Sequence, residues 1–235
     1  LADDIEAGWI VDQLALQGIN TDGCVKKIGF KTPFSNIWLN QLTGSRTIAH
    51  FRDLPELSFY DLYRINIIDY DWIHFEGRNI TVLNDFLSSR QPELKASNCR
   101  LSLEIEKPRD DIEALLPFVE IVIISSAYLL SKELSADACI AKFRSINPEL
   151  KIVCTLGDKG LLASDKSGTN YCIQADAVEG IEDTIGAGDC FIAALISSLL
   201  KSANFKQSLT AANQLAAYKI QQVGMTIDGY QNSNL

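Results

Sequence analysis

The chain has 235 residues, 47% of them apolar, and its 21 Lys and Arg stand against 30 Asp and Glu, giving a net charge of −9. This length fits one large α/β domain or two small ones, and the apolar content excludes an intrinsically disordered chain. An acidic chain without a basic block is a poor binder of nucleic acid or of an anionic membrane through its overall charge. Binding of a polyanion such as ATP therefore requires a local binding site, because the overall charge of the chain does not attract it.

The hydrophobic pattern and the cysteines predict a soluble protein of the cytoplasm. No segment reaches the roughly 18 consecutive apolar residues that cross a membrane, and the longest run, at 191–200, predicts a buried helix. The chain starts at Leu1 with no signal-like segment. Six scattered cysteines without a C-x-x-C pair, and only two histidines, disfavour a zinc site and favour a reducing compartment.

The N-terminal part combines one helix with a β-hairpin. Residues 4–17 place apolar side chains at helical spacing, and Gly18 closes the helix. Two short strands at 36–40 and 46–51 flank a turn-like segment at 41–45, a pattern that predicts a hairpin.

After Pro55 the sequence alternates between strands and helices. Apolar or alternating runs predict strands at 70–75, 100–106, 118–125, 150–156 and 161–164. Helical periodicity predicts helices at 81–89, 135–146, 187–201 and 208–223, the last one ended by Gly224. This order predicts an α/β fold in which a mostly parallel sheet is flanked by helices on both faces.

The most informative stretch is EDTIGAGDCF, at residues 182–191. Gly186, Ala187 and Gly188 are small residues directly before a long apolar helix, so the backbone can approach a ligand and the first N–H groups of the helix can point at an anion. The Asp189 carboxylate, in the first turn, can accept a proton from a hydroxyl beside that anion, as phosphoryl transfer to an alcohol requires. The alternative is a glycine-rich loop in which Asp189 only caps the helix, and a bare G-x-G would favour it.

The sequence around these glycines favours the anion-binding interpretation over the simple loop. The segment DTIGAGD at 183–189, followed by a hydrophobic helix, resembles the C-terminal signature of the ribokinase/PfkB family of carbohydrate kinases. Three other blocks resemble the ketohexokinase (hepatic-type fructokinase) subgroup of that family: GSRTI at 44–48, WIHFEGRN at 72–79 and SLEIEKPR at 102–109. The resemblance runs over nearly the whole chain. It implies a ribokinase-like core of residues 1–23 and 53–235 and a small β-hairpin lid at 24–52.

The resemblance assigns roles to the residues of the signature. Asp189 falls on the catalytic base that deprotonates the sugar hydroxyl. Gly186, Ala187 and Gly188 fall on the anion hole that holds the γ-phosphate of ATP. Mg²⁺ would arrive together with the ATP.

A monovalent cation site is implied beside the anion hole. Asp183 and the carbonyl of Ile185 fall where many members of the family bind K⁺. Carboxylate and carbonyl oxygens are ligands that suit a hard cation. A simple turn residue is the alternative role for Asp183.

Two further segments resemble the nucleotide-binding parts of the family. Thr155, Gly157 and Gly160 form a T-x-G-x-x-G block after a predicted buried strand, and a tight strand–loop–strand turn, which also needs glycine, is an equal alternative for it. Asn213 and Ala216, on the last long helix, match positions that line the adenine pocket. A capping or solvated Asn and a packing Ala are the alternatives there.

Several other polar residues have two interpretations. Arg46 matches an arginine of the lid hairpin that reaches towards the active site, whereas a surface arginine is ordinarily solvated. The charged stretches at 76–79 and 104–109 follow strands, where ligands tend to bind in open α/β sheets, and internal ion pairs are the alternative. His74, inside an apolar strand, is interpreted as a buried structural histidine. The Asn-x-x-Glu of the family is absent, because SSAY stands at 125–128.

The resemblance implies an ATP-dependent kinase that phosphorylates a ketose sugar, most simply fructose to fructose 1-phosphate, and that pairs as a homodimer through the lid hairpin. The Gly-Gly-Asn string that holds the sugar hydroxyls in the family does not occur in this sequence, so the residues that choose the acceptor are mostly absent. The resemblance implies that this chain lacks the N-terminal part of the family, with its first strands, and we expect their loss to expose strand edges. A catalytically impaired nucleotide-binding fragment or regulatory pseudokinase, and a PfkB-type kinase for another sugar or nucleoside, are the alternatives.

Overall fold

The computed structural model describes residues 1–39, 46–224, 227, 229 and 230, without the side chains of Leu39 and Arg46. The chain forms two compact units, Leu1–Ile65 and Asn66–Leu235. Residues 1–23 and 53–65, which the sequence analysis assigned to the core, fall in the smaller unit together with the hairpin. Their assignment to the ribokinase-like core stays a prediction.

Six strands form one sheet in the larger unit, in the order β3-β4-β5-β6-β7-β8. Their bounds are β3 (Trp72–Glu76), β4 (Arg100–Ile105), β5 (Ile121–Ile124), β6 (Lys151–Thr155), β7 (Leu161–Ser164) and β8 (Asn170–Ile173). The first four strands are parallel, whereas β7 is antiparallel to both of its neighbours. Within the described residues β3 pairs with β4 alone, so β3 forms one edge of the sheet.

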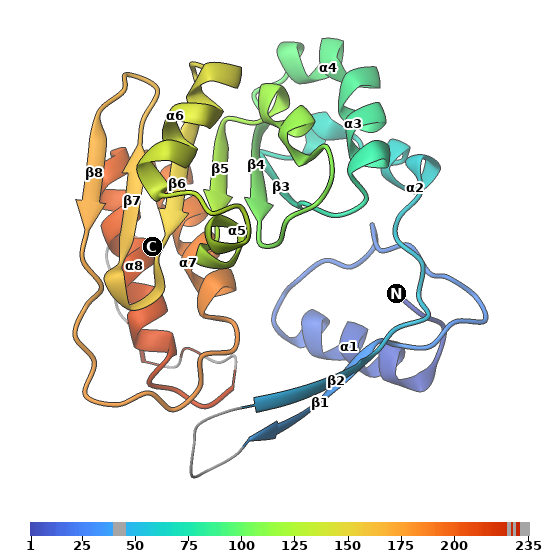
Figure 1. Ribbon diagram of the computed structural model, residues 1–235. Helices are drawn as coiled ribbons and strands as arrows, with labels where there is room; N and C mark the ends of the chain where they lie inside the picture. The colour runs from blue at the N-terminus through green and yellow to red at the C-terminus, as the bar shows by residue number, and fades with distance from the viewer. Residues whose placement is uncertain (40–45, 225–226, 228, 231–235) are drawn as a thin grey trace. The chain divides into compact units, whose positions relative to one another are not determined.

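Helices cover both faces of this sheet (Figure 1). Their bounds are α3 (Ile80–Ser89), α4 (Gln91–Ala96), α5 (Ser126–Ser131), α6 (Ala136–Ile146), α7 (Ala187–Leu200) and α8 (Phe205–Lys219), with short 3₁₀ turns η1 (Ile67–Asp69), η2 (Ile112–Phe118) and η3 (Gly157–Lys159). The paired helices α7 and α8 lie on one face, while α3, α6 and η2 lie on the other. This architecture confirms the predicted fold class.

Successive side chains of the central strands point to opposite faces of the sheet. On β6, Val153 belongs to the apolar cluster formed with α7 and α8. The next residue, Cys154, is hydrogen-bonded to Cys139 of α6 on the opposite side. Both faces of β5 and β6 are therefore buried, which explains why their sequences are nearly continuous apolar runs.

The smaller unit contains α1 (Ile5–Leu16), the antiparallel hairpin β1 (Phe34–Leu39) and β2 (Arg46–Phe51), and α2 (Phe59–Tyr63). Asp4 caps α1 through the Ala7 N–H and also accepts bonds from the hydroxyl and N–H of Thr32. The Thr32 bonds lower the pKa of Asp4 to about 2. The predicted helix and hairpin are both confirmed, and the turn at 41–45 lies outside the described residues.

The last helix begins three residues and ends four residues earlier than predicted. A capping box starts it, since Asn204 accepts the Gln207 N–H at 2.9 Å and the Gln207 side chain accepts the Asn204 N–H at 3.4 Å. At the other end, the Ile220 carbonyl accepts the N–H groups of residues 182–183. The prediction that Gly224 ends this helix was wrong, because these long-range bonds end it first.

The strand β8 was not predicted, because it is short and alternates between exposed and half-buried residues. Its turn from β7 is built on Asp165, whose carboxylate accepts bonds from Ser167, Thr169 and Tyr171. All six cysteines are free thiols. Among the described residues, no helix is both long and apolar enough to cross a bilayer.

Candidate functional site

A pocket of about 530 Å³ opens in the larger unit beside the start of α7. Its wall comes from parts of the chain that are far apart in the sequence: the start of α5, the β6–β7 loop, the segment after β8, and α7 and α8. Much of the lining is small or apolar, from Ala175, Ala177, Val178, Ile181, Phe191, Ala216, Ala217 and Ile220. An apolar hollow with a few polar groups is typical of a site for a small organic ligand.

The fold brings most of the predicted site residues to this pocket. Those that line it are Thr155, Gly157, Gly160, Ala187, Gly188, Asn213 and Ala216. Asp183, Ile185, Gly186 and Asp189 are not in the lining, but they belong to the loop and first helical turn whose Thr184 and Gly188 form part of the wall. The SSAY segment at 125–128, which was not among the predicted site residues, also contributes through Ser125 and Ser126.

The turn into α7 depends on a glycine. Gly186 is the N-cap residue and has a φ of 79°, in the left-handed region that favours glycine. The Ala187 N–H donates to the Thr184 carbonyl at 3.3 Å, which closes the turn. The first N–H groups of a helix lack intrahelical acceptors, so they form the positive end of the helix. In α7 this end lies at the pocket wall, to which Gly188 contributes. Asp189 is in the same first turn and is exposed.

The two glycines of the β6–β7 loop differ in what they tolerate. Gly160 has a φ of 81°, and a Cβ there would lie 2.0 Å from the Ile173 carbonyl oxygen. Gly157 also has a positive φ, of 64°, but a Cβ there would meet no atom within 4 Å. Gly160 is therefore required by the turn itself, as the structural alternative stated, while space is open above Gly157.

Two polar residues of the pocket wall also hold the backbone around it. The Asn213 side chain is 9% exposed, and its Nδ2 donates to the Gln174 carbonyl at 3.0 Å. The Thr155 hydroxyl donates to the Ile124 carbonyl at 3.3 Å. These bonds position the segment after β8 and the end of β6, which form two sides of the pocket.

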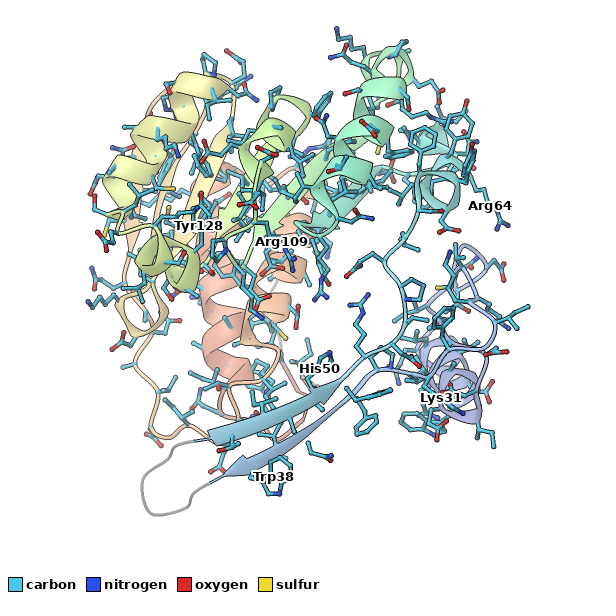
Figure 2. The ribbon with its side chains drawn as sticks, turned by 45° about the vertical axis from the view of Figure 1, so that its right-hand side comes forward. Lys31, Trp38, His50, Arg64, Arg109 and Tyr128 are labelled. Atoms are coloured by element: carbon cyan, nitrogen blue, oxygen red, sulfur yellow. The ribbon has the colours of Figure 1, made fainter. Side chains whose placement is uncertain are left out.

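A cluster of charged side chains lies at the carboxyl ends of β3 and β4. The two charged stretches of the sequence meet there because Glu76 and Glu104 are neighbours across the parallel strands. They surround a small hollow lined by Glu76, Gly77, Arg78, Glu104, Glu106, Lys107 and Arg109, the last of which is labelled in Figure 2. Ion pairs join Arg78 to Glu76 at 2.5 Å and Lys107 to Glu106 at 3.4 Å. The ion-pair alternative of the sequence analysis therefore accounts for part of this cluster.

Asp189 lies within electrostatic range of this charged cluster. Burial raises the pKa of Glu104 to about 7, and the negative charges of Asp189 and Glu76 add to the shift. Burial lowers the pKa of His74, against the opposing effect of the same two carboxylates. The Nδ1 of His74 is hydrogen-bonded to the Ser102 hydroxyl at 2.7 Å, whereas its buried Nε2 has no partner among the described residues. One ring nitrogen of His74 therefore has the hydrogen bond expected of a buried structural histidine, whereas the other has no partner among the described residues.

Sequence reasoning missed Lys219, which is completely buried. Its Nζ donates to the Asp183 carbonyl oxygen at 2.9 Å and lies 3.3 Å from the Asp183 Oδ2. The Ile185 N–H and this ammonium together hold the pKa of Asp183 below its usual range. A signal was present, because Lys219 follows Leu215 by four residues and Ala212 by seven, on the apolar stripe of α8.

Arg46, the predicted lid residue, begins β2, but its side chain lies outside what the structure describes. Its reach towards the active site stays a prediction.

The fold is shared with known kinases. Ribokinase from Thermotoga maritima superimposes with a TM-score of 0.74 at 18% identity, covering 95% of this chain and 74% of that one. Ribokinase from Arabidopsis thaliana, solved in complex with ribose and ATP, gives a TM-score of 0.73 at 18% identity over 95% and 75% of the two chains. The larger unit and the hairpin therefore define a ribokinase-like α/β fold.

Sequence comparison then gives the family. The model of the pfkB family carbohydrate kinases matches residues 9–231, and the chain belongs to this family of sugar kinases. Ketohexokinase from Mus musculus is 28% identical over 222 residues, which is 91% of this chain and 74% of the mouse protein. Ribokinase from Schizosaccharomyces pombe is 25% identical over 183 residues, which is 63% of this chain and 57% of the yeast protein.

Proposed function

We propose that this sugar kinase transfers the γ-phosphoryl group of ATP to a ketose and that it converts fructose to fructose 1-phosphate. The observation that carries the proposal is the position of Asp189, in the first turn of α7, next to the pocket wall and within electrostatic range of Glu104. Similarity to mouse ketohexokinase over 222 residues favours a ketose as acceptor.

The pocket suits the nucleotide. Its small and apolar side chains on α8, including Ala216, leave room for a flat base, and Asn213 supplies a polar group beside it. The β6–β7 loop with Thr155 and Gly157 offers backbone to the ribose and phosphates. Where Ala187 and Gly188 line the pocket, the N-terminus of α7 attracts the terminal phosphate through the first N–H groups of the helix and its dipole.

In the reaction, the oxygen of a sugar hydroxyl attacks the γ-phosphorus. The bond between that phosphorus and the β–γ bridging oxygen breaks, and ADP leaves with the electron pair. The hydroxyl proton passes to the Asp189 carboxylate. Gly186, Ala187 and Gly188 stabilise the charge on the transferred group through the end of α7. Magnesium, if it is bound together with the ATP, would neutralise part of the phosphate charge.

Asp189→Asn tests the assignment of the base. This change keeps the shape of the first turn but removes the proton acceptor, so turnover should fall by about 10²–10⁴-fold while ATP affinity stays within a few-fold. ADP release coupled to a reporter enzyme, with Mg-ATP and with or without fructose, measures turnover, and calorimetry with a non-hydrolysable ATP analogue measures binding.

The matched control is Asp137→Asn, which removes an exposed carboxylate from the first turn of α6 and should leave turnover unchanged. Equal activity of Asp189→Asn and the wild type contradicts the mechanism. ATP binding without any sugar-dependent ADP release contradicts the kinase activity and supports the alternative of a nucleotide-binding protein without turnover.

We also propose that two copies pair through the hairpin. The register of β1 and β2 places Phe34, Trp38 and Phe51 on one face, with exposed fractions of 55%, 58% and 43%. His50 lies on the other face, as Figure 2 shows together with Trp38. A two-stranded sheet with exposed apolar side chains is stabilised by covering them with a second sheet. The six free thiols favour the cytoplasm as the location of this assembly.

A further inference from the structure

A buried positive charge lies beneath the loop that leads into α7. Lys219 has no exposed surface, and its ammonium contacts both the carbonyl oxygen and the Oδ2 of Asp183. Burying an ammonium is costly unless negative or polar partners compensate it. These contacts supply that compensation, and they connect the end of α8 to residue 183.

The same loop is held by several backbone bonds that converge on Asp183. Its Oδ1 accepts the Ile185 N–H at 2.9 Å, and its Oδ2 accepts the Gly224 N–H at 3.3 Å. The N–H groups of residues 182 and 183 donate to the Ile220 carbonyl at 2.8 and 3.2 Å. The Lys219 ammonium joins this arrangement through its two contacts with Asp183. A change in its charge therefore acts on the loop that ends at Gly186, the N-cap of α7.

The ammonium contacts one of the two ligands that the sequence analysis gave to potassium, the Asp183 carboxylate. Both carry one positive charge and bind oxygen, and Asp183 was the expected carboxylate ligand. Here the Asp183 carbonyl oxygen and Oδ2 are already bonded to Lys219. A potassium ion that shared this carboxylate would lie next to an ammonium of like charge, which is unfavourable. The residues present therefore do not fit an added K⁺ at Asp183.

We propose that Lys219 is the built-in monovalent cation of the loop at 183–186, so that nucleotide binding at the α7 N-terminus does not depend on K⁺. This inference rests on the proposed nucleotide site, and it changes the expectation about the activating ion. An ammonium tethered through α8 is always present at its ligand, whereas a free ion must be taken from solution.

The test compares the wild type with Lys219→Met, which keeps an unbranched side chain of similar length but removes the charge. Affinity for a fluorescent ATP analogue and the midpoint of thermal unfolding are measured in potassium chloride and in tetramethylammonium chloride at equal ionic strength. The wild type should give the same affinity, within about two-fold, in both salts. In tetramethylammonium, Lys219→Met should bind at least about ten-fold more weakly and unfold roughly 10 °C lower, because Asp183 loses its partner.

Potassium, which can enter the vacated site, should restore several-fold of the affinity of Lys219→Met and raise its unfolding midpoint, while leaving both values of the wild type unchanged. Lys206→Met, in the first turns of the same helix but exposed, is the matched control and should behave like the wild type.

Tightening of the wild-type nucleotide affinity by about ten-fold in potassium overturns the proposal, and so does a Lys219→Met variant that binds as well as the wild type without potassium. The wild-type comparison decides the question even where Lys219→Met does not fold. If no variant binds the analogue, the proposed nucleotide site is wrong, and the thermal data still decide whether potassium replaces the ammonium in Lys219→Met.

Discussion

At the scale of single residues, Glu104 is a carboxyl near the candidate site whose pKa is raised to about 7. It is a half-buried carboxyl at the end of β4, where Glu76 is its neighbour across the strands and Asp189 is within electrostatic range. Its pKa of about 7 means that the native protein holds a proton there that the unfolded chain releases near pH 4.5. A protonated Glu104 leaves Asp189 with one fewer negative charge beside it.

The raised pKa predicts how stability depends on pH. Because the native state binds the extra proton between about pH 4.5 and 7, this group lowers the free energy of unfolding as the pH rises through that window. Glu104→Gln stays neutral, so its stability relative to the wild type should increase between pH 4.5 and 8, by on the order of 1 kcal/mol because solvent screens this half-buried carboxyl. Urea unfolding at several pH values measures the difference.

The exposed Glu149→Gln is the control for removing one charge from this acidic chain. A difference between Glu104→Gln and the wild type that stays constant from pH 4.5 to 8 would show that Glu104 does not titrate in this window.

At the scale of elements, the β6–β7 loop contains one glycine that the fold requires, Gly160, and one with open space beside it, Gly157. Gly160→Ala places a methyl group 2.0 Å from a backbone oxygen of β8. The loop must therefore shift, and we expect a loss on the order of 3 kcal/mol in the free energy of unfolding. Gly157→Ala should lower the free energy of unfolding by only about 1 kcal/mol, because alanine is less stable than glycine in a left-handed backbone conformation. Chemical unfolding of the two variants measures both losses.

The same pair of variants tests the role of the loop in the pocket. If the loop lies against the nucleotide, Gly157→Ala should weaken ATP binding by more than its small loss of stability explains, because the methyl group enters space that is open in the protein alone. Equal ATP affinity of Gly157→Ala and the wild type would leave the glycines of this loop with a purely structural role.

At the scale of the whole molecule, the exposed hairpin predicts the oligomeric state. Trp38→Glu places a charge in the proposed contact and should convert a dimer into a monomer at micromolar concentration. Sedimentation velocity measures the change in mass. Trp9→Glu is the matched control, because Trp9 is 63% exposed on α1 in the same unit and should not affect pairing. A wild type that sediments as a monomer would refute pairing through the hairpin.

The sequence by itself determined the order of strands β3 to β7 and of helices α3, α6, α7 and α8, because these elements follow from local periodicity. The short helices α4 and α5 and the exposed strand β8 lack such a pattern and were not predicted. The two-sided burial of β5 and β6 was visible as continuous apolar runs, and the turn before α7 was visible as its glycines. These features depend on neighbours within a few residues, so the pattern alone carries them. Among the predicted nucleotide residues, Thr155 lies at the carboxyl end of a parallel strand, β6, where ligands tend to bind in open α/β sheets. Asn213 and Ala216 reach the same pocket from α8, which local patterns do not place.

Only the tertiary structure decided which of these residues meet and what charge they carry. Lys219 contacts Asp183 across 36 positions of the chain, and Glu104 is influenced by Asp189 from a different layer of the fold. The end of α8 likewise depends on the bond between Ile220 and the loop before α7. The free energy of a buried charge depends on the atoms packed around it, and residue order along the chain does not specify those atoms until the layers are assembled.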